Sequence, residues 1–139
     1  MGPTVSLALP GTQSIYYASN VKSGANTVTV NFNTLAAYPD VRIMEYSGVS
    51  KLDATSAAIG VGPEHGQRTG RDHVRAGAAI RSQQCGVLHA KPGAGYTQRI
   101  ITWWGNIVED QFVTMPGTYD ATAPQSASYG WIMQIATFK

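Results

Sequence analysis

The stretch Asn26-Thr-Val-Thr-Val-Asn-Phe-Asn33 alternates polar and apolar side chains with a period of two residues. In an extended chain its three apolar side chains, Val28, Val30 and Phe32, share one face, and the polar side chains between them share the other. Most of its residues are β-branched or aromatic, which favours a pleated, half-buried strand. The stretch therefore predicts an antiparallel strand with one face on a core.

Segments of the same kind recur along the chain, separated by Gly and Pro residues that favour turns. The segment nearest the C-terminus carries Trp131, Met133 and Ile135 on one face, and we expect these side chains in the core. Many short strands without a helical period predict an all-β fold, an antiparallel β-sandwich of jelly-roll or immunoglobulin-like type. The predicted strands are Ser14–Ala18, Asn26–Asn33, Val41–Tyr46, Thr97–Trp104, Ile107–Val113, Tyr119–Thr122 and Trp131–Phe138.

Length and composition predict a single domain covering residues 1–139. The chain has 139 residues, of which 43% are apolar and 13% charged, so disorder is not expected. A net charge of +2 is too small for a protein that binds the phosphate backbone of nucleic acids. One cysteine cannot form an intramolecular disulfide, and no apolar run has the length of a membrane span. Without a signal-peptide pattern at its start, the chain is expected to be cytosolic or a module of a longer secreted protein.

The segment 61–93 differs from its flanks. It contains no aromatic residue, all three histidines, the only cysteine, and five basic against two acidic residues. The rest of the chain is nearly neutral and rich in aromatic residues, which suits binding of uncharged sugars better than binding of phosphates. Residues 72–82 are compatible with a weak helix or an irregular pair of strands. Because long stretches without an element are uncommon in compact domains, we expect part of the segment to form strands.

Seven segments in the flanks resemble a secreted β-sandwich module that recurs in large extracellular proteins of soil bacteria. They are Gln13–Ala18, Gly24–Phe32, Tyr38–Gly48, Tyr96–Ile101, Ile107–Asp110, Gly117–Pro124 and Trp131–Phe138. The resemblance implies an extracellular, non-catalytic module, and this chain is similar to carbohydrate-binding modules attached to cellulases. Family members usually carry a Ser/Thr-rich pair of strands in place of the segment 61–93, and we interpret the difference as that part of the gene read in a shifted frame.

Trp103 and Trp104 are the main candidates for a binding surface. Adjacent residues of a strand point to opposite faces, so both cannot lie in one core and at least one should meet solvent. A flat indole can stack on the apolar faces of β-linked glucose rings, which predicts a sugar-binding platform. The alternative is one core tryptophan and one surface or oligomer contact. Residues near the strand ends would extend the platform: Tyr96 and Tyr129 by their rings, Trp131 as the alternative to its expected place in the core, and Gln98, Arg99 or Gln111 by hydrogen bonds.

The acidic residues allow a structural Ca²⁺, because a hard cation prefers oxygen ligands. Asp53, Glu109 and Asp110 are the candidate ligands, although no Asp-x-Asp loop pattern is present. Salt bridges with Arg42 and Arg99, or solvated faces, explain the same carboxylates equally well.

Enzyme chemistry is the weaker alternative. Glu45 and Glu109 could serve as the acid and the nucleophile of a glycosidase. The segment 61–93 offers two further sets, for a nucleophile with its base or for a zinc site, but their spacings match no known pattern. These sets are Cys85 with His89, and His65 and His73 with Asp72.

The leading hypothesis is therefore a secreted, non-catalytic module that directs an attached glycoside hydrolase to a β-glucan such as cellulose. Such a module acts by raising the local concentration of the attached catalytic domain at its polysaccharide. The alternative is an immunoglobulin-like spacer or adhesion module of a large extracellular protein, with the tryptophans in a protein interface.

Overall fold

The computed structural model describes residues 4–7, 11–49, 51–62, 73–74, 77–85, 91–120, 122–126 and 129–139, with the backbone alone at residues 4–7, 62, 73–74, 77–85 and 129. Strands are the regular elements of this part of the chain, and none of it forms a helix. The described residues therefore include no apolar helix that could span a membrane. The strands are β1 Thr4–Leu7, β2 Gly11–Ser14, β3 Leu52–Gly62, β4 His73–Val74, β5 Gly77–Cys85, β6 Thr97–Ile101, β7 Ile107–Val113, β8 Gly117–Thr118 and β9 Tyr129–Phe138.

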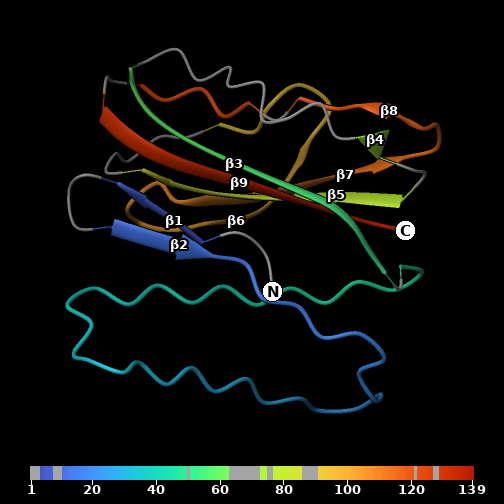
Figure 1. Cartoon of the computed structure of the whole chain (residues 1–139), viewed down its shortest axis with the longest axis horizontal. Coiled ribbons are helices and arrows are strands. Elements are labelled where there is room, and N and C mark those ends of the chain that lie inside the picture. Colours follow the sequence, from blue (N-terminus) through green and yellow to red (C-terminus); the bar gives the residue numbers. More distant parts are fainter. Residues whose placement is uncertain are drawn as a thin grey trace.

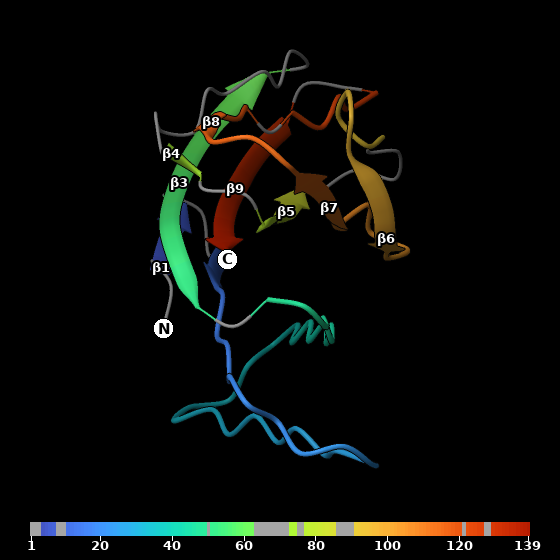
Figure 2. The ribbon, with the colours of Figure 1, turned by 90° about the vertical axis from the view of Figure 1, so that its right-hand side faces the viewer.

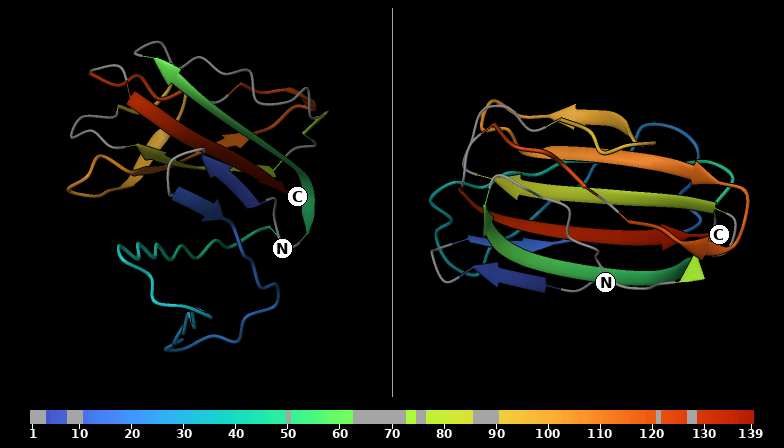
Figure 3. Two further views of the ribbon diagram at one scale, coloured as in Figure 1. Left: turned by 60° about the vertical axis from the view of Figure 1, so that its left-hand side comes forward. Right: turned by 90° about the horizontal axis from the view of Figure 1, so that it is seen from above.

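The fold is all-β and antiparallel, which confirms the predicted class. Its main sheet has five strands in the order β3-β9-β5-β7-β6, and the view from above in Figure 3 shows them side by side. β1 pairs with β2 and β4 pairs with β8 in two further two-stranded ladders. The last strand of the chain, β9, is inserted between β3 and β5, so segments far apart in sequence become neighbours (Figure 1).

β9 is an interior strand of the main sheet, and its residues from Trp131 to Phe138 are all buried. On one face Trp131, Met133 and Ile135 are at most 3% exposed, which confirms the prediction that they lie in the core. They cluster with residues from β7 and from the loops before β6 and before β9. The remaining members of this cluster are Tyr96, Ile107 and Ala123, with Ala58 of β3 packed against it.

The opposite face of β9 is covered by the N-terminal part of the chain. The side-chain amide of Gln134 donates a hydrogen bond to the carbonyl oxygen of Gln13 in β2, at 3.2 Å. The rings of Tyr17 and Phe138 meet edge to face with their centroids 5.4 Å apart. These contacts attach the start of the segment 15–49 to the sheet, while most of that segment extends below it in Figures 1 and 2.

The prediction of a half-buried strand at 26–33 is wrong. No described strand pairs with this stretch, and Val28, Val30 and Phe32 are each about half exposed, at 54%, 46% and 54%. The alternation is present, but no core of the described residues lies against it, because the chain bends away from the five-stranded sheet after β2 (Figure 2). A period of two therefore indicates which side chains share a face without indicating what that face meets.

The other strand predictions have mixed outcomes. Strands β6, β7 and β9 confirm the predictions at 97–104, 107–113 and 131–138, although β6 ends at Ile101 before the tryptophans. Residues 41–46 and the described residues 119, 120 and 122 form no strand, and only Ser14 of the predicted segment 14–18 lies in one. Within the segment 61–93, β4 and β5 confirm that part of it forms strands.

Candidate binding site at the hairpin between β6 and β7

A tight turn joins β6 to β7 and presents Trp103 and Trp104. The amide of Gly105 donates to the carbonyl of Thr102 at 2.9 Å, and the amide of Thr102 donates to the carbonyl of Asn106 at 2.9 Å. Gly105 has a φ of 76°, a left-handed conformation that glycine adopts without steric cost. The Thr102 hydroxyl also accepts the amide of Asn106 at 3.2 Å. These bonds are those of a hairpin whose turn ends in a glycine bulge.

Both tryptophans at this turn are exposed, Trp103 to 79% and Trp104 to 63%. The prediction that at least one of them meets solvent is confirmed. Their placement on a strand is wrong, because the strand ends at Ile101 and both residues occupy the turn itself. Two exposed indoles at the tip of one hairpin form an apolar surface of the kind that usually marks a binding site.

The base of the turn is attached to a segment from the other end of the chain. The Asn106 side chain, 4% exposed as a residue, donates to Oδ2 of Asp40 at 2.7 Å. Arg42 forms a salt bridge with the same oxygen at 3.2 Å and donates to the carbonyl of Ile107 at 3.5 Å. The guanidinium and the carboxylate neutralise each other. The turn residues 102–106 carry no charge, so the surface is apolar and electrically neutral.

Tyr38 is an aromatic residue of this region that the sequence interpretation missed. It is 90% exposed and precedes Asp40 by two residues, while Trp104 precedes Asn106 by two residues. The hydrogen bond between Asp40 and Asn106 joins the two chain segments that carry these aromatic residues. Pro39-Asp40 marked a turn in the sequence, but nothing in the sequence indicated its partner 66 residues away.

The structure does not place Tyr96 in the platform. Gly95, with a φ of 80°, turns the chain so that Tyr96 packs among Ile107, Ala123 and Trp131 and is 8% exposed. Gln98 is exposed on β6, but four residues of extended strand, roughly 13 Å, separate it from the start of the turn. The side chain of Tyr129 lies outside the described residues. Trp103 and Trp104 are thus the predicted residues that remain on one exposed surface.

The three candidate Ca²⁺ ligands do not converge. Glu109 and Asp110 are consecutive in β7, so their side chains point to opposite faces of the sheet, and both are buried. Asp53 lies on β3, three strand spacings or roughly 14 Å from β7, and pairs with Lys139. In the described part of the chain, no group of three or more His, Cys, Asp or Glu side chains is arranged to hold a metal.

The buried carboxylates have local partners. Oε2 of Glu109 accepts the backbone amide of Gly93 at 3.1 Å. Oδ2 of Asp110 accepts Nε of Arg99 at 2.8 Å, and Arg99 occupies the extra position of a bulge in β6. Burial, and then the nearby carboxylate of Asp110, raise the pKa of Tyr46 well above its ordinary value. Arg42 pairs with Asp40 and Arg99 pairs with Asp110, so the salt bridges named as an alternative explanation of the acidic residues are present.

The residues of the enzyme alternatives are not brought together in the described part of the chain. Glu45 is exposed on the segment 40–46, whereas Glu109 is fully buried in β7 on the core side of the sheet. His65, Asp72 and His89 lie outside the described residues, as do the side chains of His73 and Cys85. Comparison with protein-family models, curated proteins and solved structures found no match.

Proposed function

We propose that this chain is a non-catalytic carbohydrate-binding module, secreted as part of a longer protein, that attaches a glycoside hydrolase to a β-glucan such as cellulose. The observation that carries the proposal is the pair of exposed indoles at a hydrogen-bonded turn. Because the turn is closed by backbone bonds and tied to Asp40, the backbone that carries the rings has little conformational freedom to lose on binding. The faces of a sugar ring are apolar and its hydroxyls point outward, which suits a neutral aromatic surface.

We also propose that the fold is a β-sandwich in which the five-stranded sheet is one layer. Two segments support a second layer on the face opposite Met133. They are the β1–β2 ladder with Gln13 and the extended segment 40–46, whose inward residues Arg42 and Tyr46 face β7. In residues 41–46 half-buried and exposed positions alternate, as expected for a strand-like segment over a sheet.

The first prediction is that replacing both tryptophans, Trp103→Ala with Trp104→Ala, abolishes binding to glucans. Truncation of a central aromatic anchor typically costs at least about 2 kcal/mol, or roughly 30-fold in affinity. Affinity electrophoresis in soluble β-glucans and pull-down on insoluble cellulose measure this loss. The matched control is Phe112→Ala, which removes an aromatic ring that is 58% exposed on β7, six residues from the turn.

Retention equal to that of the wild type in the double variant would contradict the platform. If the wild type itself binds neither cellulose nor soluble β-glucans, the glucan proposal fails.

The second candidate function is a spacer or adhesion module. One observation favours it, the exposed apolar side chains along residues 16–43. These are Tyr16, Tyr17, Val21, Val28, Val30, Phe32, Leu35, Tyr38, Val41 and Ile43.

A further inference from the structure

The segment 26–33 has the sequence pattern of a strand, but it pairs with no strand of the described part of the chain. It contains no charged residue and no proline, and Lys22 is the only charge between residues 15 and 39. Edge strands of natural proteins usually carry charges, prolines or bulges that prevent pairing with another chain. None of these protections is present here. The segment is also accessible, because it lies on the side of residues 41–48 away from the main sheet in Figures 1 and 2.

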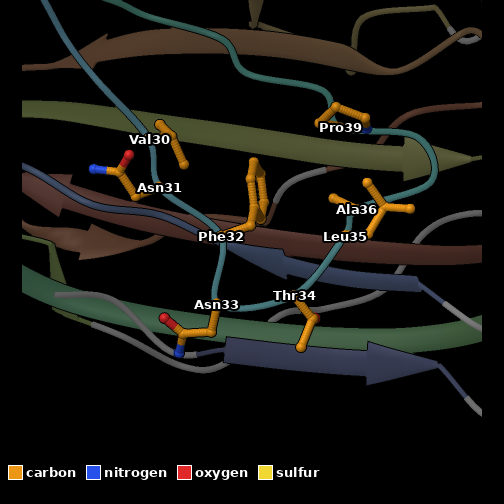
Figure 4. Close-up of a pocket in the computed structure, with 8 residues that line it drawn as sticks. All are labelled: Val30, Asn31, Phe32, Asn33, Thr34, Leu35, Ala36 and Pro39. Carbon is orange, nitrogen blue, oxygen red and sulfur yellow. The ribbon is translucent and has the colours of Figure 1, made fainter.

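Turns hold the segment at both ends. Before it, Gly24 has a φ of 117°, and the side chain of Asn26 donates to the carbonyls of Lys22 and Gly24. After it, the chain bends around an open cavity of about 550 Å³ that residues 30–36 and Pro39 line. In Figure 4 the ring of Phe32 lies on the inner side of this bend, while Asn31 points away. The stretch between the two turns is therefore presented as an extended, half-exposed segment.

We propose that this segment pairs with the same segment of a second copy of the chain, in an antiparallel ladder whose twofold axis passes through Val30. In that register Val30 faces Val30 of the second copy, and Val28 faces its Phe32. Thr29 faces Asn31, so apolar residues meet apolar residues and polar residues meet polar residues. A twofold interface requires such self-complementarity.

The register is specific because a shift by one residue would place Val28 and Phe32 opposite polar side chains. Aromatic and β-branched pairs across antiparallel strands stabilise a ladder, and Val28 with Phe32 forms two such pairs per dimer. The paired ribbon presents six apolar side chains on one face. Val41 and Ile43 lie on the segment between 26–33 and the main sheet, and their 50% and 57% exposure offers an apolar surface to cover that face.

Sedimentation equilibrium of the whole chain tests the proposal. We expect a concentration-dependent mass that approaches twice the 14.8 kDa of one chain. Val30→Asp should yield the single-chain mass, because it places two carboxylates opposite each other at the twofold axis. The matched control Val21→Asp adds the same charge at a residue that is 51% exposed outside the strand, and it should keep the dimer. Since both valines are half exposed, each variant is expected to fold, with a cooperative thermal transition.

Disulfide trapping tests the register. In a Cys85→Ser background, Val30→Cys should cross-link two chains at least tenfold faster than Thr29→Cys under mild oxidation. Residues at the axis have Cβ atoms about 5 Å apart, whereas Thr29 lies diagonal to its counterpart at about 7 Å, beyond the reach of a disulfide without movement.

Three results would overturn the proposal: a single-chain mass at all concentrations, a Val30→Asp variant that remains dimeric, or equal cross-linking at positions 29 and 30. A dimer that dissociates in the Trp103→Ala, Trp104→Ala variant but not in Val30→Asp would place the contact at the β6–β7 turn, which also contradicts it. Glucan binding by Val30→Asp is unaffected under the proposed function, so the two proposals fail separately.

Discussion

Glu109 and Asp110 show how neighbouring residues of one strand acquire different environments. Both are buried, but Glu109 faces the core side of the sheet and accepts the amide of Gly93. Asp110 faces the other side, where Arg99 supplies the opposite charge and Tyr46 lies close by. A buried carboxylate needs such partners because burial alone disfavours its charged form. Each residue thus holds a separate segment against β7, Glu109 the loop at 93 and Asp110 the segment ending at 46.

The protonation of Tyr46 is predicted to make the stability of the folded protein depend on pH. Burial and the charge of Asp110 raise the pKa of its hydroxyl in the folded protein above the ordinary value of about 10. The folded state therefore holds the proton more tightly than the unfolded state. The resulting stabilisation is complete below about pH 10 and is lost as the pH rises from there toward the folded-state pKa. Tyr46→Phe removes this dependence.

Urea unfolding between pH 8 and 11.5 measures the effect. The midpoint of the wild type should fall more steeply above pH 10 than that of Tyr46→Phe, since the lysines titrate in both proteins and cancel in the comparison. Parallel curves for the two proteins would show that Tyr46 has the same pKa in the folded and unfolded chains.

The β6–β7 hairpin provides a prediction at the scale of the element. Gly105 has a left-handed backbone conformation at which a Cβ costs about 1–2 kcal/mol. Gly105→Ala should lower the free energy of unfolding by about 1 kcal/mol, and Gly105→Asn by less, because asparagine tolerates this conformation. Chemical denaturation measures both values. Under the proposed function, Gly105→Ala also weakens glucan retention and Gly105→Asn restores part of it; equal stability of the wild type and the alanine variant would contradict the assigned turn.

The elements also show what the sequence could and could not predict. β7 was predicted with its observed bounds, because its β-branched and aromatic residues lie between two Gly turns. β3 was missed, because its central residues are alanines and Gly60, where a Cβ would collide with the indole of Trp131. Small residues in β3 make room for large ones in β9, and such complementarity between strands is invisible in either strand alone.

The candidate site also has features that were predicted from the sequence and features that were not. The exposure of a tryptophan was predicted from the adjacency of Trp103 and Trp104 on a strand, but both are exposed because they occupy the turn after β6. The loss of Tyr96 to the core depends on the turn at Gly95, and the contribution of the segment 38–42 depends on Asp40 meeting Asn106. Such contacts depend on how distant segments pack, which a single sequence without structure does not contain.

At the scale of the whole molecule, the position of β9 determines how the fold is held together. Its residues join β3 on one side to β5 on the other, although β3 begins 77 residues earlier. Since β9 shares the largest fully buried side chains of the described core with β7, the sheet has no complete interior until this last strand is in place. Stability should therefore be concentrated in β9 and should decrease toward the strands at the edges of the sheet.

Two isoleucines that face each other across the ladder between β3 and β9 test this distribution of stability. Ile132 of β9 and Ile59 of β3 are register partners, but Ile132 is fully buried and Ile59 is 47% exposed. Ile132→Ala should lower the free energy of unfolding by about 3 kcal/mol, as expected when buried side-chain carbons are removed and leave a cavity. Ile59→Ala should lower it by less than about 1 kcal/mol, since solvent already reaches its side chain. Urea unfolding compares the two variants directly. Equal losses of unfolding free energy would mean that the edge strand β3 contributes as much to the core as the interior strand β9.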